Sequence, residues 1–335
     1  MIDSFGRNID YMRISITDRC NLRCRYCMPD GVEWLPMADI LSYEEIGRVC
    51  RAAARLGIRH LKITGGEPLV RKGCPELIGS LKTIPGIEAV TITTNGILLE
   101  QHLDRLKLAG VDGINVSLDT LDRRQFADLT GFDRLDQVLS GIRRAVDAGF
   151  KVKVNAVSLK LDRDGDGSYG WERLAGLARE YPLDVRFIEM MPIGYGKQFE
   201  TVDHQKLLEQ MRQVFPDMEM DTAKHGFGPA VYYRVPGFQG SLGLISAIHG
   251  KFCGQCNRVR LTSTGYLKTC LCYEDGVDLR PVLRGADTGA EDGPDGGGQE
   301  LCRVMEQTIY GKPGAHCFEE PERITEGHNM SSIGG

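Results

Sequence analysis

The sequence contains no apolar run long enough to cross a membrane, although 41% of its 335 residues are hydrophobic. A membrane-spanning helix needs about 20 consecutive apolar residues, so we expect no membrane partner. Residues 1–7 also lack the apolar core of a signal peptide and the Arg- and Ser-rich character of a transit peptide. Together these absences predict a cytoplasmic protein.

An excess of positive charge is also missing, since the formal net charge is −5. Non-specific nucleic-acid binding requires a basic surface, so we expect no nucleic-acid partner. An anionic substrate would therefore have to be bound by a local basic pocket. The length and apolar content allow either one large α/β domain or two domains of ordinary size.

A disulfide framework is not expected in a reducing cytosol, so the eleven cysteines are better explained as metal ligands or buried thiols. Six of them form two groups of three, each within a short stretch of chain. The first group is Cys20, Cys24 and Cys27, and the second is Cys253, Cys256 and Cys270.

The first group has the spacing C-x3-C-x2-C and follows a short, extended apolar run. Three thiolates from one loop can converge on a soft centre such as an iron–sulfur cluster. With three protein ligands, a four-iron cluster keeps one iron open for chemistry. A zinc loop or a redox-active thiol cluster is the alternative, although structural zinc normally takes four ligands.

This spacing, with an aromatic residue (Tyr26) before the last cysteine, resembles the signature of radical S-adenosylmethionine (SAM) enzymes. In that family the open iron chelates SAM, and reductive cleavage of SAM gives a 5′-deoxyadenosyl radical. The Gly65-Gly66-Glu67-Pro68 turn resembles the family's GGEP element, which holds the methionine amino group. Backbone without side chains allows the close approach that such an element needs.

Six strand–helix units follow one another between residues 11 and 214, which predicts a parallel sheet with right-handed crossovers. Eight units would suggest a closed barrel, whereas six suggest an open, partial (βα)6 barrel of the TIM type. Functional residues should then lie at the carboxyl ends of the strands. The strands are expected at residues 11–17, 60–64, 89–93, 113–118, 151–157 and 185–189.

After residue 215, short alternating runs separated by Gly and Pro predict a small antiparallel extension that carries the second cysteine group. We therefore expect two regions, 1–215 as the partial barrel and 216–335 as the C-terminal extension with a second cluster. Residues 285–298 are rich in Gly and Asp and predict a flexible loop. The chain ends in Gly334-Gly335, which should be either disordered or threaded toward the active site.

With both cysteine groups, the terminal Gly-Gly and the opening run RISITDRC at residues 13–20, nearly the whole chain resembles the GTP 3′,8-cyclase (MoaA) family. These lyases convert GTP to (8S)-3′,8-cyclo-7,8-dihydroguanosine 5′-triphosphate in the first step of molybdenum cofactor biosynthesis. The resemblance implies two 4Fe–4S clusters and SAM as cofactors, with guanine bound at the open iron of the second cluster. It also implies a flavodoxin- or ferredoxin-type electron donor and a downstream cyclic pyranopterin monophosphate synthase, and it is compatible with a homodimer.

The resemblance carries the family's site residues onto positions of this chain. The six grouped cysteines are the iron ligands, and residues 216–335 supply part of the GTP site. SAM contacts fall on Tyr26, Gly66, Ser117 and Met191. GTP contacts fall on Arg13, Lys62, Thr93, Lys153, Arg258, Val259 and Arg260, of which Arg13, Arg258 and Arg260 are expected to be catalytic.

The chemistry of these residue types agrees with a nucleotide site. A triphosphate carries several negative charges, and arginine forks suit phosphate oxygens and purine edges. Arg258 and Arg260 stand two apart on a predicted strand, so their side chains face the same way. Taken singly, each of these cations would be an ordinary surface charge. No general acid or base is evident in the sequence.

Two other functions stay open. A radical SAM maturase would act on a peptide side chain, although such enzymes usually carry more cysteines than this chain. A non-catalytic zinc module would need four ligands at each site. Cys272 bears on the choice, because as a fourth ligand it would close the iron that guanine needs. We therefore expect Cys270 to ligate iron and Cys272 not to.

Overall fold

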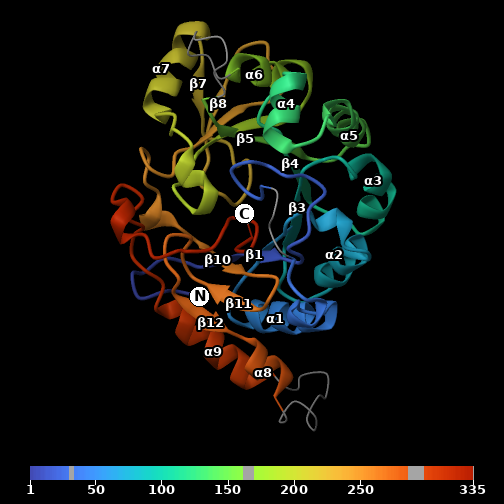
Figure 1. Cartoon of the computed structure of the whole chain (residues 1–335), viewed down its shortest axis with the longest axis vertical. Helices are drawn as coiled ribbons and strands as arrows, with labels where there is room; N and C mark the ends of the chain where they lie inside the picture. The colour runs from blue at the N-terminus through green and yellow to red at the C-terminus, as the bar shows by residue number, and fades with distance from the viewer. Residues whose placement is uncertain (30–33, 161–169, 286–297, 335) are drawn as a thin grey trace.

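The computed structural model describes residues 1–29, 34–160, 170–285 and 298–334. Their strands form one curved twelve-stranded sheet in the order β12-β11-β10-β1-β2-β3-β4-β5-β6-β9-β8-β7, so β12 and β7 are its two ends. Helices cover the outer face of the curve (Figure 1). The sheet is therefore an open barrel, as the sequence predicts.

Six consecutive strands form the predicted parallel centre of the sheet, with boundaries within two residues of the expected ones. They are β1 (Tyr11–Ser15), β2 (His60–Thr64), β3 (Ala89–Thr94), β4 (Gly113–Ser117), β5 (Val152–Ser158) and β6 (Asp184–Glu189). The helices between and after them are α1 (Tyr43–Arg55), α2 (Cys74–Lys82), α3 (Leu99–Leu108), α4 (Arg123–Thr130), α5 (Leu135–Asp147), α6 (Trp171–Glu180) and α7 (His204–Val214).

Helix α1 shows how the sequence sets these boundaries. Ser42 accepts a hydrogen bond from the Glu45 main chain while the Glu45 carboxylate accepts one from the Ser42 main chain, which completes a capping box. The apolar residues of α1, including Ile46, Val49 and Cys50, fall on one face and are fully buried. Packing of such faces against the sheet supplies most of the stability of these helices.

The central strands alternate apolar and polar residues, and this alternation makes two different faces. Met12, Leu61 and Val154 are fully buried among the outer helices. Their neighbours Arg13 and Lys62, directly opposite each other on β1 and β2, point the other way into the space that the sheet encloses. The helix-facing side is thus apolar and the enclosed side, here called the lumen, is polar and charged.

The C-terminal region adds strands to both edges of this centre. β9 (Leu242–Ile245) pairs in parallel with β6 and begins a flank with β8 (Val231–Arg234) and β7 (Glu219–Asp221). β10 (Arg258–Leu261) pairs in parallel with β1 and begins a flank with β11 (Tyr266–Lys268) and β12 (Gly276–Asp278). The expected antiparallel extension is therefore divided into two flanks, each joined to the barrel by one parallel strand.

The remaining elements are short or lie near the second flank. Helices α8 (Arg280–Arg284) and α9 (Gly298–Tyr310) follow β12, and α9 packs on α1. Single 3-10 turns occur at Met37–Asp39, Pro68–Val70, Gly194–Gln198, Cys253–Gln255 and Pro321–Arg323. The predicted flexible loop falls mostly on residues 286–297, which lie outside the described residues. Across the described ranges, no helix is long and apolar enough to span a membrane.

Candidate active site

The first cysteine group lies in the loop that leaves the carboxyl end of β1. The main-chain N–H groups of Arg23 and Arg25 donate to carbonyl groups at the end of α4, which anchors the loop. Cys27 donates to the Cys24 carbonyl at 3.0 Å and closes a tight turn between two of the thiols. Burial and the neighbouring thiol of Cys20 raise the pKa of Cys27 to about 12. Burial and the neighbouring thiol thus disfavour the thiolate form, which a bound cationic metal centre would stabilise.

The Gly65-Gly66 turn after β2 packs directly against the start of the cysteine loop. A Cβ atom on Gly66 would lie 2.4 Å from the Arg19 carbonyl oxygen, so only glycine fits. The Glu67 carboxylate is fully buried and accepts hydrogen bonds from Leu69, Thr94 and Asn95. Asn95 in turn donates to Asn21 and lies 3.7 Å from the Cys20 sulfur. Glu67 thus ties the turn, the end of β3 and the cysteine loop together.

The four residues predicted to contact SAM lie at the carboxyl ends of four strands or in the loops that follow them. Tyr26 and Gly66 follow β1 and β2, Ser117 ends β4, and Met191 follows β6. The Tyr26 hydroxyl donates to Asp119 at 2.7 Å, and Asp119 also accepts from the Val157 main chain. Because parallel strands present their carboxyl ends at one edge, the structure brings the four positions to the same end of the barrel.

The lumen is a cavity of about 940 Å³ whose lining includes five of the seven residues predicted to contact GTP. This volume is in the range of small-molecule sites. Arg13, Lys62 and Lys153 come from β1, β2 and β5, and neutral polar residues lie between them on β3 and β4. The five lining residues are Arg13, Lys62, Thr93, Lys153 and Arg258.

The lumen cations lie close enough to disfavour one another's charge. Burial, together with the guanidinium groups of Arg258 and Arg186, lowers the pKa of Arg13 to about 10. Burial and the same kind of repulsion, from Arg186 first, lower the pKa of Lys62 well below its usual value. Asp184 pairs with Lys153 at 2.8 Å, so part of this charge is balanced internally. A polyanion in the lumen would stabilise the rest.

The other two predicted GTP residues are placed differently. Val259 is 1% exposed and its side chain packs in the main core. Arg260 does not line the cavity, and its guanidinium donates to the Gly334 carbonyl oxygen at 2.7 Å. A Cβ atom on Gly334 would lie 3.2 Å from the Ser15 side chain, at the inner side of β1. The C-terminal tail therefore reaches into the barrel, which Figure 1 shows as the red segment near its centre. Gly335 lies outside the described residues.

The second cysteine group lies at the opposite end of the barrel from the first. Cys256 precedes Arg258, which pairs with Tyr11 at the amino end of β1. Cys270 follows β11, which is antiparallel to β10, so it returns to the same end. Burial alone would raise the pKa of Cys256, but the charges of Lys312 and Arg258 outweigh it and lower that pKa to about 7. These cations favour the thiolate form that binds metal.

The cysteines fit clusters better than single metal ions. All eleven are free thiols. In the described parts of the chain, no three Cys, His, Asp or Glu side chains are gathered tightly enough to hold one ion. A zinc site requires such convergence, whereas a four-iron cluster distributes its thiolates over separate irons. Three cysteines in each group suit a four-iron cluster, whereas structural zinc normally takes four ligands.

Cys272 has a different neighbour from Cys270. Its sulfur lies 3.3 Å from the sulfur of Cys317, and both residues are buried in a small apolar cluster with Ile193 and Phe318. Cys270 is only half-buried at the edge of that cluster. This difference supports the expectation that Cys272 is not a ligand.

Sequence reasoning missed further polar residues of the lumen. Arg186 on β6 also lines it, held by hydrogen bonds to the side chains of Asn115 and Asn155. Lys224 approaches from the segment between β7 and β8. Arg186 could have been found from strand alternation, because it lies two residues from Asp184 and shares its face. Nothing in the sequence signals that Lys224 meets the barrel.

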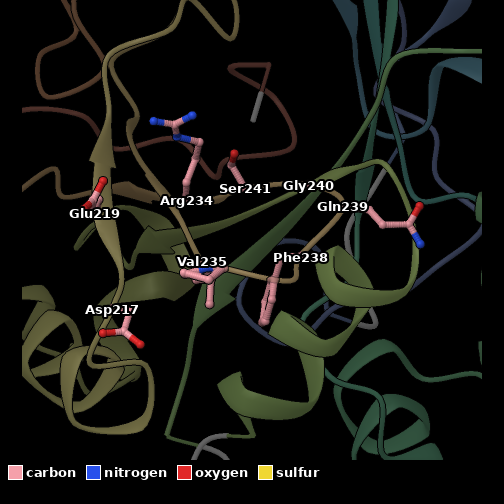
Figure 2. A pocket seen from close by; sticks show the side chains of 9 residues that line it. Asp217, Glu219, Arg234, Val235, Phe238, Gln239, Gly240 and Ser241 are labelled. Carbon is pink, nitrogen blue, oxygen red and sulfur yellow. The ribbon is translucent and has the colours of Figure 1, made fainter.

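A second hollow, of about 430 Å³, lies at the β7–β8 flank. Figure 2 shows Glu219 and Arg234 on its rim with Phe238 and Ser241 nearby. Its lining contains no cysteine and none of the predicted site residues. This hollow is therefore separate from the candidate active site.

Two family models match most of the chain between them. The Radical SAM superfamily model matches residues 14–166, which include the first cysteine group. The Molybdenum Cofactor Synthesis C model matches residues 183–318, which include the second group. A solved structure of Streptococcus suis SuiB bound to S-adenosylmethionine has a TM-score of 0.63 and 17% identity, with 91% of this chain and 67% of that chain covered. At this identity the likeness shows the fold alone.

Curated relatives match over the full length. The GTP 3′,8-cyclase of Clostridium perfringens (strain 13 / Type A) is 40% identical over 336 residues, covering 100% of both chains. The GTP 3′,8-cyclase of Geobacter sulfurreducens is 40% identical over 341 residues, covering 100% of this chain and 99% of the relative. This chain therefore belongs to the GTP 3′,8-cyclase family of the radical SAM superfamily.

Proposed function

We propose that this protein converts GTP to (8S)-3′,8-cyclo-7,8-dihydroguanosine 5′-triphosphate, the first step of molybdenum cofactor biosynthesis. The cofactors of its family are 4Fe–4S clusters and SAM. The observation that supports the proposal best is the cationic lumen, which lies between the two cysteine groups and is crowded with mutually repelling positive charge. Such a cavity suits a nucleoside triphosphate.

The cysteine groups have separate proposed roles. Cys20, Cys24 and Cys27 would hold the cluster that binds SAM, beside Tyr26 and the other SAM contacts. Cys253, Cys256 and Cys270 would hold the auxiliary cluster that faces guanine. When bound, these cofactors supply the one-electron chemistry that removes hydrogen from the ribose and the iron site that meets the base. All further contributions come from the protein's own side chains.

The lumen residues would bind and orient the nucleotide. Arg13 and Lys62 offer charge to the triphosphate from the neighbouring strands β1 and β2, and Lys153 offers it from β5. Arg186 is already held rigidly by its two asparagine partners. Arg258 lies next to Cys256, and its guanidinium stacks over Phe252 at 5.1 Å, so it can fix the base end. Bringing the ribose and guanine together in one orientation is the protein's main contribution to rate.

Several finer assignments belong to the same proposal. Residues 1–215 would act as the SAM-binding barrel, and residues 216–335 as the auxiliary-cluster and GTP-binding region. The electron donor would be of the flavodoxin or ferredoxin type. A cyclic pyranopterin monophosphate synthase would take the product. The location would be cytoplasmic, and a homodimeric assembly is compatible with the family.

The proposal is tested by anaerobic turnover with SAM, GTP and a reductant, with 5′-deoxyadenosine and the cyclised nucleotide quantified by mass spectrometry. Arg258→Ala should lower product formation roughly 100-fold or more, because hydrogen bonds to a charged group are lost, while iron content stays unchanged. Arg234→Ala, which alters an exposed arginine on β8 outside the lumen, is the matched control. Wild-type product formation by Arg258→Ala would overturn the assigned pocket.

A further inference from the structure

Arg7 and Asp3, which the proposed reaction does not use, form a buried ion pair near the N-terminus. Arg7 is 7% exposed and Asp3 is 3% exposed. The Arg7 Nε donates to Asp3 Oδ2 at 2.7 Å, and the main-chain N–H groups of Phe5 and Arg7 donate to Asp3 Oδ1. Burying a pair of charges is costly, so it needs further hydrogen bonds to be maintained. Those bonds lead to the second cysteine group.

The Arg7 guanidinium donates to four main-chain carbonyl oxygens. One belongs to Cys253, at 3.0 Å from Nη1. The other three belong to consecutive residues of the segment after α9, at 3.0 Å for Gly314, 3.2 Å for Lys312 and 2.7 Å for Pro313. Arg7 thus joins three stretches of chain that are far apart in sequence. The Cys253 carbonyl also accepts the main-chain N–H of Cys256 at 3.1 Å, so the Arg7 guanidinium joins the 312–314 segment directly to the turn between two of the cysteines.

The segment held by Arg7 itself touches the second cysteine group. The Lys312 ammonium, 3% exposed, donates to the carbonyl of Thr269, the residue before Cys270. The main-chain N–H of His316 donates to the Cys253 sulfur at 3.4 Å. Two of the three cysteines are therefore positioned by contacts that depend on the 312–316 segment. Arg7 joins that segment to the Cys253 carbonyl, while His316 joins it to the Cys253 sulfur.

We infer that Arg7, oriented by Asp3, is a positioning residue for the auxiliary cluster. The inference rests on the proposed function, because it takes Cys253, Cys256 and Cys270 as that cluster's ligands. Groups that hold the ligands, and N–H groups that donate to their sulfurs, control retention of a metal centre and its reduction potential. Loss of the Arg7 clamp should therefore release the auxiliary cluster selectively, since no contact of Arg7 reaches the first cysteine group in the described residues.

The geometry also predicts which substitutions are tolerated. Arg7 uses a planar fork of five N–H donors, which lysine, with three donors at one point, cannot reproduce. Arg7→Lys should therefore fail to replace arginine, and Arg7→Gln should be worse because the charge is also lost. Asp3→Asn keeps the guanidinium but weakens the carboxylate that orients it, so its effect should be the smallest of the three.

The test is anaerobic reconstitution of the full-length variants, followed by iron analysis and electron paramagnetic resonance with SAM or GTP added separately. Wild type should contain about eight irons per chain. Arg7→Gln should fall to about four, keep its SAM-responsive signal and lose its GTP-responsive signal. Arg284→Gln is the matched control, because Arg284 also clamps two carbonyls and a carboxylate, near α1 and away from both cysteine groups. It should keep both signals.

Each other outcome contradicts a specific claim. Full iron with an unchanged GTP-responsive signal in Arg7→Gln would overturn the positioning role alone. Four irons in wild type would overturn the two-cluster function instead. If Arg7→Gln does not fold, Asp3→Asn decides, measured as the rate of iron release to a chelator. Faster release from the auxiliary site than in wild type and Arg284→Gln supports the inference, whereas equal acceleration at both sites would show a general loss of stability and overturn it.

Discussion

At the scale of single residues, the two thiols of Cys270 and Cys272 show how closely spaced groups can take different roles. Cys272→Ser should keep the full iron content and the GTP-dependent spectral change, because its neighbour is Cys317. Cys270→Ser should lose the auxiliary cluster. Iron analysis and electron paramagnetic resonance of both variants check this. Loss of four irons on Cys272→Ser would show that Cys272 is a ligand and that the site has no open iron.

His204 gives a residue-scale prediction about pH. It is 2% exposed between the hydroxyls of Ser158 and Ser246, each 3.0 Å from a ring nitrogen, and burial lowers its pKa to about 4. An unfolded histidine titrates near 6.5, so below that pH the unfolded chain binds the extra proton. The free energy of unfolding should therefore fall by roughly 2 kcal/mol between pH 7 and pH 5 through this residue alone.

His204→Gln isolates that contribution, because glutamine keeps one donor and one acceptor but does not titrate. Urea unfolding at pH 7 and pH 5 should show a steeper loss of stability in wild type than in the variant. Other groups titrate equally in both proteins, so their contributions cancel when the pH-dependent loss of stability of the variant is subtracted from that of wild type. Parallel losses in the two proteins would mean that His204 is protonated in the folded state.

The residue types of the site were predictable, but their exact partners were not. The cysteine groups could be recognised from their local spacing, and Arg13, Lys62 and Lys153 were assigned from the resemblance to the family. The engagement of Arg260 by Gly334 could not, since it joins residues 74 positions apart. Arg7 was missed for the same reason. A buried clamp has no local pattern that distinguishes it from a surface arginine.

At the scale of elements, the C-terminal tail behaves as a part of the barrel interior. Ile333 is 2% exposed, and Gly334 has φ +77° beside Ser15. Deleting residues 334 and 335 should free Arg260 and impair product formation without changing iron content. Gly334→Ala should have a smaller effect of the same kind, because a Cβ in that backbone conformation costs about 1 kcal/mol.

Gly176→Ala in α6 is the control for that substitution, since a Cβ there has no neighbour within 4 Å. It should leave product formation unchanged. Product assays on the three variants check the prediction. Full activity of the truncated protein would show that the tail is an ordinary chain terminus without a role in the reaction.

Element prediction succeeded where a repeating pattern was present. The six central strands were found because apolar and polar residues alternate along them. Helix caps and glycines mark where the helices between them begin and end. β9 and β10 were expected as antiparallel strands, yet they pair in parallel with β6 and β1. Whether two strands pair in parallel depends on how the chain crosses over between them, and local amino-acid composition carries no information about that crossover. Helix α4 was missed because it is short and mainly polar at the surface.

At the scale of the whole molecule, the two cysteine groups lie at opposite ends of one charged lumen. The parallel strands direct Cys20, Gly66, Ser117 and Met191 to the carboxyl end. The parallel pairing of β10 with β1 brings Cys256 to the amino end. A nucleotide in the lumen would therefore meet SAM at its ribose and the auxiliary cluster at its base. This arrangement is the central claim.

Turnover with GTP deuterated at the 3′ carbon tests that claim most directly. If the lumen presents the ribose to SAM, one deuterium should appear in 5′-deoxyadenosine, and the cyclised product should lack it. The reaction is run anaerobically with reductant and analysed by mass spectrometry, with unlabelled GTP as the control. Unlabelled 5′-deoxyadenosine formed alongside product that retains deuterium would contradict the account.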